Sequence, residues 1–186
     1  MAAWERNLVE AADRGTRIHA EIETLLLGMA PCQLAPVPET LCPVVATWIA
    51  DRYPPEKYLL YPELIVYGSA YDGGRIIPGT IDLAAVHRYT GDVTLVDWKT
   101  GSVDDKKGAK DKVFGIKGTR LAKYSIQLGL YKLILERHYG VTVDTLEVVQ
   151  ITPGAEPTVY PAKPELIRAD LCASIAAMFD NDGATE

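Results

Sequence analysis

The sequence predicts an α/β fold in which a mixed β-sheet is flanked by helices. Three extended segments, 58–67, 76–86 and 93–99, follow one another with turn signals between them. A long amphipathic segment at 119–139 comes next, and a further extended segment at 143–151 follows it. Successive tight turns favour an antiparallel meander, whereas a strand that returns through a crossover helix usually pairs in parallel. The order of the segments therefore predicts a sheet with both kinds of pairing.

The remaining helices are predicted from the spacing of apolar residues. Apolar side chains recur at helical spacing within 4–28, where Gly15 is a candidate position for a break or kink. A second helix is expected at 39–52, and a terminal helix at 164–180 begins with a proline.

A chain of 186 residues is long enough for one domain with a sizeable core. We therefore expect a single domain over 1–186, with a helical N-terminal part at 1–55. The core is expected at 56–152, and the C-terminal helix completes the domain.

Composition and charge exclude several classes of protein. The hydrophobic content of 48% and charged content of 24% are ordinary for a globular protein. No apolar run approaches the roughly 18 residues of a membrane helix, and the acidic, amphipathic N-terminus is not typical of a secretory signal. A net charge of −6 argues against indiscriminate binding to nucleic acid.

The three cysteines, Cys32, Cys42 and Cys172, are far apart and form no CxxC motif. A zinc ribbon is therefore not expected, and free thiols in a reducing cytoplasm are the default.

One segment departs from the acidic average. Between Ser102 and Lys123, three acids accompany seven basic residues: Lys106, Lys107, Lys110, Lys112, Lys117, Arg120 and Lys123. A charge run of this kind can be a solvated loop. Because it follows the strand at 93–99 directly, it is also a candidate DNA-binding surface.

Charged residues interrupt two of the predicted strands. Asp97 and Lys99 are two apart, so both side chains project from the same face of their strand. Asp82 lies on the preceding strand. Pairing through a turn centred near residues 90–91 would place Asp82 level with about Lys99, as a diagonal neighbour of Asp97.

Two carboxylates that converge on one face repel each other unless a positive charge lies between them. A magnesium ion would meet this need, because it prefers a few carboxylate oxygens together with water and substrate phosphate. Lys99 would then add a fixed positive charge beside the metal. The alternative is an Asp97–Lys99 ion pair and an unrelated buried Asp82 with a backbone partner.

These motifs carry a family resemblance. "GTID" on one strand and "VDWKTG" on the next resemble the active-site signature of the PD-(D/E)XK nuclease superfamily, and more narrowly its RecB-type exonuclease branch. The helix "KYSIQLGLYKLILE" supplies the Gln127 and Tyr131 of a Gln-x-x-x-Tyr motif, and "GTRIHAEIETLLLG" offers His19. The four elements occur in the same order over about residues 15–139.

The resemblance implies a restriction-endonuclease-like core and a DNA exonuclease that depends on Mg²⁺ or Mn²⁺. By resemblance, the metal would be held by His19, Asp82, Asp97 and the backbone carbonyl of Trp98. The catalytic set would be Asp82, Asp97, Lys99, Gln127 and Tyr131.

The helix at 119–139 can also be interpreted without the resemblance. Arg120, Lys123, Gln127 and Tyr131 form a row of donors suited to a phosphate backbone, although a solvated helix face would look the same. Tyr124 lies near this row and could stack on a base.

Three further side chains are ambiguous. His19 could equally be a core or surface histidine. Glu23, four residues on along the same helix face, could hydrogen-bond a metal ligand or could simply be solvated. Glu63, on the first strand, is a further carboxylate candidate for the site, and an ion pair is its expected role.

Two cofactor classes are not expected. No GxxxxGK[ST] loop is present, so no fused ATPase motor is predicted. CRISPR-associated relatives bind an iron–sulfur cluster through four cysteines, and three cysteines do not suffice for one.

The leading hypothesis is therefore a metal-dependent deoxyribonuclease that acts on DNA ends in recombination, repair or phage DNA processing. A homo-oligomer is compatible with it. The alternatives are a non-catalytic DNA-binding or assembly subunit that retains the fold, and an interaction protein in which these residues form surface ion pairs.

Overall fold

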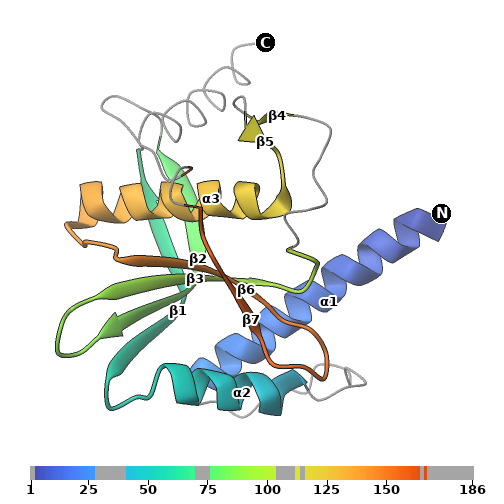
Figure 1. Cartoon of the computed structure of the whole chain (residues 1–186), viewed down its shortest axis with the longest axis horizontal. Helices are drawn as coiled ribbons and strands as arrows, with labels where there is room; N and C mark the ends of the chain where they lie inside the picture. The colour runs from blue at the N-terminus through green and yellow to red at the C-terminus, as the bar shows by residue number, and fades with distance from the viewer. Residues whose placement is uncertain are drawn as a thin grey trace.

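The computed structural model describes residues 3–27, 41–69, 76–103, 112–113, 116–163 and 166. In the sequence, two helices precede the strands of the sheet, and one long helix lies between its third strand and its last two strands (Figure 1). In chain order the elements are α1 (Ala3–Leu26), α2 (Leu41–Arg52), β1 (Tyr58–Gly68), β2 (Ile77–His87), β3 (Val93–Lys99), β4 (Lys112–Val113), β5 (Ile116–Lys117), α3 (Arg120–Ile134), the π-helical turn η1 (Leu135–Tyr139), β6 (Thr145–Gln150) and β7 (Thr158–Pro161).

The main sheet has five strands in the order β1-β2-β3-β6-β7. β3 and β6 pair in parallel, and the other neighbours pair antiparallel. The predicted mixed sheet with flanking helices is therefore confirmed, and it has the restriction-endonuclease-like arrangement. Three short strands were not predicted. β7 has four residues, while β4 and β5 have two each, and segments this short carry no clear period.

The helices match the sequence predictions where the structure describes them. α1 continues through Gly15 without a break. The long helix ends at Gly140, which has the left-handed φ of 66° that favours glycine at a helix end. The turn signal between the first two predicted strands is Asp72-Gly73-Gly74, and it lies outside the described residues. The helix expected at 164–180 also lies outside them, apart from Leu166. No helix among the described residues is long and apolar enough to span a membrane.

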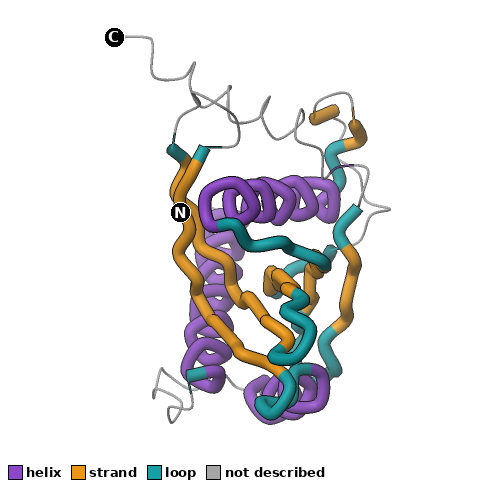
Figure 2. Tube along the Cα trace, turned by 90° about the vertical axis from the view of Figure 1, so that its left-hand side faces the viewer, coloured by secondary structure: helices purple, strands orange, loops and turns teal. Residues whose placement is uncertain are grey.

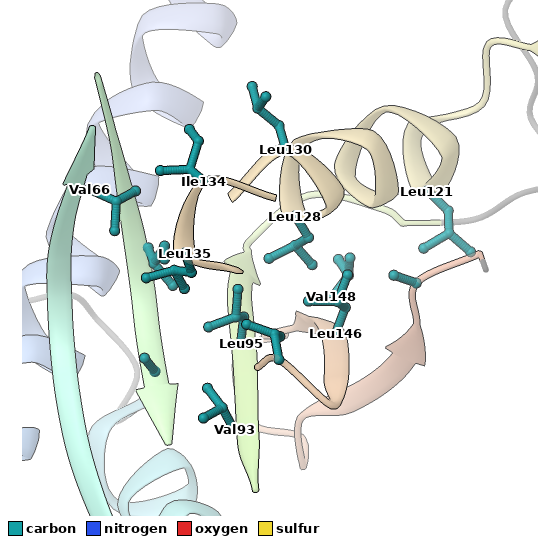
Figure 3. Packing of buried hydrophobic residues seen from close by; sticks show 14 of the residues in the cluster. Val66, Val93, Leu95, Leu121, Leu128, Leu130, Ile134, Leu135, Leu146 and Val148 are labelled. Atoms are coloured by element: carbon teal, nitrogen blue, oxygen red, sulfur yellow. The ribbon is translucent and has the colours of Figure 1, made fainter. Parts of the chain in front are cut away.

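The sheet separates two hydrophobic cores. α3 and η1 cover one face, where Leu128, Ile134 and Leu135 pack against sheet residues such as Leu95 and Val148 (Figure 3). α1 and α2 cover the opposite face with a second buried cluster, which contains Ile18, Ile22, Val45, Ile49 and Trp98. In Figure 2, α3 lies above the strands and α2 lies below them. Each face of β3 is therefore buried against a different helix layer.

The sheet splits in its middle. β2 and β3 share four residue pairs, from Leu83–Val96 to Val86–Val93. Beyond these pairs, β3 continues to Lys99 beside β6, whereas β2 stays paired with β1. The two strands diverge and leave a gap at the residues next to the split.

A local distortion of β1 lies beside the split. Glu63 has a φ of 46°, which is unusual for a residue other than glycine. Leu60 packs on the α1/α2 side, whereas Leu64 packs on the α3 side, although both have even numbers. The alternation of side chains along β1 therefore changes phase at Glu63. The same change occurs in β2 between Leu83 and Ile81, which flank Asp82.

The predicted register of Asp82 was wrong by two residues. Because Leu83 pairs with Val96, the line of pairs would place Asp82 opposite Asp97 rather than Lys99. The turn is centred about one residue earlier than predicted, and Gly91, with a φ of 79°, donates its backbone N–H to the carbonyl of His87.

The packing of α3 on β2 depends on a glycine. A Cβ atom at Gly79 would lie 2.3 Å from Cε1 of Tyr131, closer than any real contact. We predict that Gly79→Ala displaces the Tyr131 ring and lowers the free energy of unfolding by about 1–3 kcal/mol. Urea denaturation measures the loss. Thr80→Ala, a change at the exposed neighbouring position, is the control, and equal stability of the two variants would contradict the packing argument.

Candidate active site

His19 is held by the strand that follows the split. Its Nε2 atom lies 3.1 Å from the carbonyl oxygen of Trp98. A carbonyl can only accept, so Nε2 carries the proton when the imidazole is neutral, and Nδ1 has a free lone pair. Nδ1 lies 3.6 Å from Oδ1 of Asp82 and 4.0 Å from Oε1 of Glu63. The histidine thus presents a lone pair toward two carboxylates.

His19, Glu63 and Asp82 form a compact group of candidate metal ligands. One ligand atom from each residue lies within 4.8 Å of the others, and all three side chains are partly buried. Burial, together with the charge of Lys99, lowers the pKa of His19, which favours the neutral imidazole that a metal requires. Burial raises the pKa of Glu63, and the neighbouring charge of Asp82 raises it further.

Asp82 has a second function in the fold. Its Oδ2 atom accepts a hydrogen bond of 2.7 Å from the backbone N–H of Trp98. The carboxylate therefore takes the place of a backbone acceptor where β3 leaves β2. Burial raises the pKa of Asp82, although Lys99 and the Trp98 N–H act in the opposite direction. The fold thus orients Oδ2 toward the backbone and Oδ1 toward His19.

Asp97 is the most buried of these acids, with 4% of its surface exposed. Its Oδ1 atom accepts a 2.7 Å hydrogen bond from Nζ of Lys99, whereas Oδ2 is buried without a hydrogen-bond partner among the described residues. Burial raises the pKa of Asp97 to about 6 against the charge of Lys99, and the charge of Asp82 contributes to the increase. An unpartnered buried carboxylate oxygen is costly, so it indicates a missing positive ligand.

The donor set fits a hard divalent cation. Carboxylate oxygens and a neutral imidazole nitrogen are suitable ligands for magnesium or manganese, and a cation would offset the burial of three acids that have raised pKa values. Asp97 is not one of the three grouped ligands, but its charge interacts with those of Asp82 and His19, and its buried Oδ2 has no hydrogen-bond partner among the described residues.

Lys99 is held from two sides. Nζ donates to Asp97 and also lies 4.7 Å from the centre of the Tyr124 ring, in a cation–π contact. An ammonium group has three N–H donors, so these contacts leave capacity for a water or a phosphate oxygen. Tyr124, which the sequence suggested as a base-stacking residue, here packs against the ammonium group.

The other predicted residues of α3 make contacts with one another or with neighbouring segments. Nε2 of Gln127 donates to the hydroxyl of Tyr131 over 3.2 Å. Arg120 is exposed and donates to the carbonyl of Ser102, so it holds the chain just after β3. Lys123 is exposed.

The predicted basic segment is described only in part. The backbones of Lys112 and Lys117 pair across β4 and β5. Lys106, Lys107 and Lys110 lie outside the described residues, and so do the side chains of Lys112 and Lys117. Their role in DNA binding stays a prediction.

Glu63 and the Trp98 carbonyl were both candidates from the sequence, and the structure places both beside His19. Glu63 lies among the candidate ligands with its Oε1 atom 4.0 Å from Nδ1 of His19, so its role as a ligand or as an ion-pair partner stays a prediction. The available signal was Pro62-Glu63 in the middle of an apolar strand. The Trp98 carbonyl was expected to bind metal, and here it lies within hydrogen-bond distance of His19. A carbonyl has a second lone pair, so its role as a ligand stays a prediction.

Comparison with protein families identifies the superfamily of the chain. The model of the PD-(D/E)XK nuclease superfamily matches residues 7–181. The chain belongs to the PD-(D/E)XK nuclease superfamily. That match spans both helix layers and the sheet, and it includes each of the six residues His19, Glu63, Asp82, Asp97, Lys99 and Gln127.

Two solved structures resemble the chain distantly. One is a candidate exonuclease from Eubacterium rectale, with 18% identity and a TM-score of 0.47 over 76% of this chain and 54% of that one. The other is the protein SSO0001, with 15% identity and a TM-score of 0.40 over 73% of this chain and 55% of that one. The chain thus spans about half the length of either protein. No curated protein matches the sequence.

The raised pKa of Asp97 generates a prediction on stability. The folded state holds this proton up to about pH 6, whereas the unfolded state releases it near 3.8, so ionisation of Asp97 destabilises the metal-free fold as pH rises between these values. We predict that Asp97→Asn is more stable than wild type above pH 6, by up to about 3 kcal/mol, and that the difference vanishes below pH 4.

Urea denaturation in EDTA at several pH values measures this difference. Added Mg²⁺ should stabilise the wild type more than the variant, because the variant lacks one carboxylate ligand. If the variant is less stable than wild type at pH 7.5 in EDTA, the ionised Asp97 does not destabilise the metal-free fold, and the prediction is wrong.

Proposed function

We propose that this protein is a metal-dependent deoxyribonuclease that hydrolyses phosphodiester bonds at DNA ends, within the RecB-type exonuclease branch of its superfamily. The observation that carries the proposal is the convergence of His19, Glu63, Asp82, Asp97 and Lys99 at the split between β2 and β3. Family membership supports hydrolytic chemistry at this position. DNA as the substrate and exonuclease action come from the motif resemblance.

The proposed ligands are His19 through Nδ1, Glu63, Asp82 and Asp97, with the Trp98 carbonyl as a further candidate. A Mg²⁺ or Mn²⁺ ion at this site would supply an activated water and would neutralise charge on the phosphate. The neutral state of His19 favours binding, because its lone pair is not blocked by a proton. Burial of the acids excludes bulk water and strengthens their attraction for a cation.

Lys99 is proposed to stabilise negative charge on the phosphate or to hold the attacking water. Asp97 and Tyr124 fix its position, so the ammonium group needs no rearrangement when the substrate binds. Gln127 and Tyr131 are proposed to contact the DNA strand beside the scissile phosphate. Arg120 and Lys123, with the basic segment at 106–117, would guide the phosphate backbone toward the site.

We propose that residues 1–186 act as one nuclease domain, in which the helical part at 1–55 supplies His19 and the core at 56–152 supplies the acids and the lysine. The proposed setting is DNA recombination, repair or phage DNA processing in the cytoplasm. These assignments rest on the resemblance.

Degradation of linear DNA by the purified protein tests the proposal. We predict activity that requires Mg²⁺ or Mn²⁺ and falls at least about a hundredfold in Asp97→Ala and in Lys99→Ala. Closed circular DNA should resist, because it has no ends. Arg88→Ala is the control, because this exposed arginine donates to backbone carbonyls of Pro55 and Tyr58, away from the acids.

Each failure has a separate meaning. A wild type that degrades neither single- nor double-stranded DNA with either metal would reject the enzyme and favour a binding subunit that retains the fold. Degradation of closed circles at the rate of linear DNA would reject the exonuclease assignment alone. Full activity in Lys99→Ala would remove only the proposed role of that lysine.

A further inference from the structure

The part of the β1–β2 hairpin beyond the candidate site exposes an apolar surface. Ile65 is 72% exposed, Tyr67 61% and Ile76 66%. Pro78 and Thr80 on β2 are also exposed. Large apolar side chains that gather on one surface usually mark a binding site. We call this part of the hairpin the arm. The outer face of the arm is the side formed by Ile65, Tyr67, Ile76, Pro78 and Thr80.

Strand pairing explains why these residues share one side. Ile65 pairs with Thr80, and Tyr67 pairs with Pro78, so their side chains project together. The opposite side of the arm is closed by α3 and η1, since Tyr131 packs on Gly79 and His138 packs on Gly68. Figure 2 shows the two strands rising together along one flank of α3. The outer face is therefore the side of the arm that faces away from α3.

The outer face begins at the proposed metal ligands. Ile65 and Tyr67 are two and four residues beyond Glu63 on β1, and Thr80 is two residues from Asp82 on β2. At about 3.3 Å per residue, Tyr67 lies about 13 Å along the strand from Glu63. Stacked nucleotides are about 3.4 Å apart, so a strand cleaved at the acids would bring its next few bases level with this face.

The change of phase at Glu63 creates this exposure. If side chains alternated regularly through β1, Ile65 and Tyr67 would point toward the α3 side, as Tyr61 does opposite Ala84, a residue of the α3-side core. The left-handed conformation of Glu63 instead turns Leu64 and Val66 into the α3 core. The distortion that positions a candidate ligand thus also presents the apolar residues beyond it.

The residue types of the outer face are suited to contact with bases rather than with phosphates. The five described residues that form it include no basic side chain that could pair with a phosphate and no acid that would repel DNA. The Tyr67 ring is oriented by an edge-to-face contact with Tyr139, and the hydroxyl of Tyr139 lies within hydrogen-bond distance of the backbone N–H and carbonyl of Tyr67. An exposed, oriented ring is a stacking platform for a base of any type. Base faces are available only when the strand is unpaired.

We propose that the outer face of the arm binds the unpaired bases of a DNA strand next to the scissile phosphate, so that the substrate is a single-stranded or frayed end rather than an intact duplex end. This inference rests on the proposed function and deepens it. Lys99 and a metal ion held by the acids would position the phosphate, while Tyr67 and its apolar neighbours hold the bases that follow.

The test compares two variants of the full chain. The double variant Tyr67→Ala/Ile76→Ser removes the face, and Tyr67→Phe keeps an aromatic ring there. Tyr89→Ala is the matched control, because Tyr89 is 79% exposed but lies at the opposite end of β2. KM and kcat are measured on duplexes with blunt ends and with single-stranded overhangs. Quenching of 2-aminopurine near the end is measured in EDTA.

We expect the wild type to prefer overhangs. The double variant should show a KM for overhangs about tenfold higher with kcat within about twofold, together with weaker 2-aminopurine quenching. Tyr67→Phe and Tyr89→Ala should match the wild type in both measurements. A purely structural role for the face would lower thermal stability without changing KM and quenching selectively.

Two results would overturn the inference alone. One is a wild type that degrades DNA while the double variant keeps its KM and its quenching. The other is a wild-type dimer in light scattering that the double variant dissociates without a change in KM, which would make the face an interface between copies of the chain. A wild type that degrades no DNA but still quenches 2-aminopurine through Tyr67 would reject the nuclease function and retain the binding face.

Discussion

The hydrogen bond from the backbone N–H of Trp98 to the carboxylate of Asp82 marks the constraint on which the site depends. β2 and β3 stop pairing after four residue pairs. Each backbone N–H and C=O group left unpaired at the split needs another hydrogen-bond partner. Asp82 supplies one acceptor, and His19 lies against the Trp98 carbonyl. The gap between the strands is therefore lined by polar side chains that the fold itself requires, and these are the side chains proposed to bind metal.

The second consequence of the split is electrostatic. Asp97 projects into the gap from β3, while Glu63 and Asp82 reach it from the other two strands. Burial raises the pKa of all three, and one positive charge, on Lys99, pairs directly with Asp97. The left-handed φ of Glu63 adds backbone strain, which typically costs of order 1–3 kcal/mol. Unfavourable charge and strain at one place indicate selection for binding rather than for stability.

Much of this arrangement could be predicted from local patterns. The period of two along β3 predicts that Asp97 and Lys99 share a face, and the period of the helix predicts that Gln127 and Tyr131 do so. Both pairs are in contact or close together in the structure. Family resemblance supplied His19, which no local pattern distinguishes from an ordinary helical histidine. The mixed sheet followed from the order of turns and helices.

Other features depend on long-range geometry and could not be predicted. The register of Asp82 was missed by two residues, because it depends on the conformation of the 88–91 turn. Glu63 joins the acids only because its backbone adopts a left-handed conformation that its residue type disfavours. The contact between Tyr124 and Lys99 requires α3 to cross over the end of β3, which no spacing within the sequence specifies. β7 was too short to recognise.

Anomalous diffraction from a crystal soaked in manganese tests the central claim most directly. The account predicts a strong peak within coordination distance of Nδ1 of His19 and of carboxylate oxygens from Asp82 and Asp97, with Glu63 as a direct or water-mediated ligand. Loss of the peak in Asp97→Asn crystals would strengthen the assignment. A wild-type map without manganese between these residues, or with the ion bound elsewhere, would contradict it.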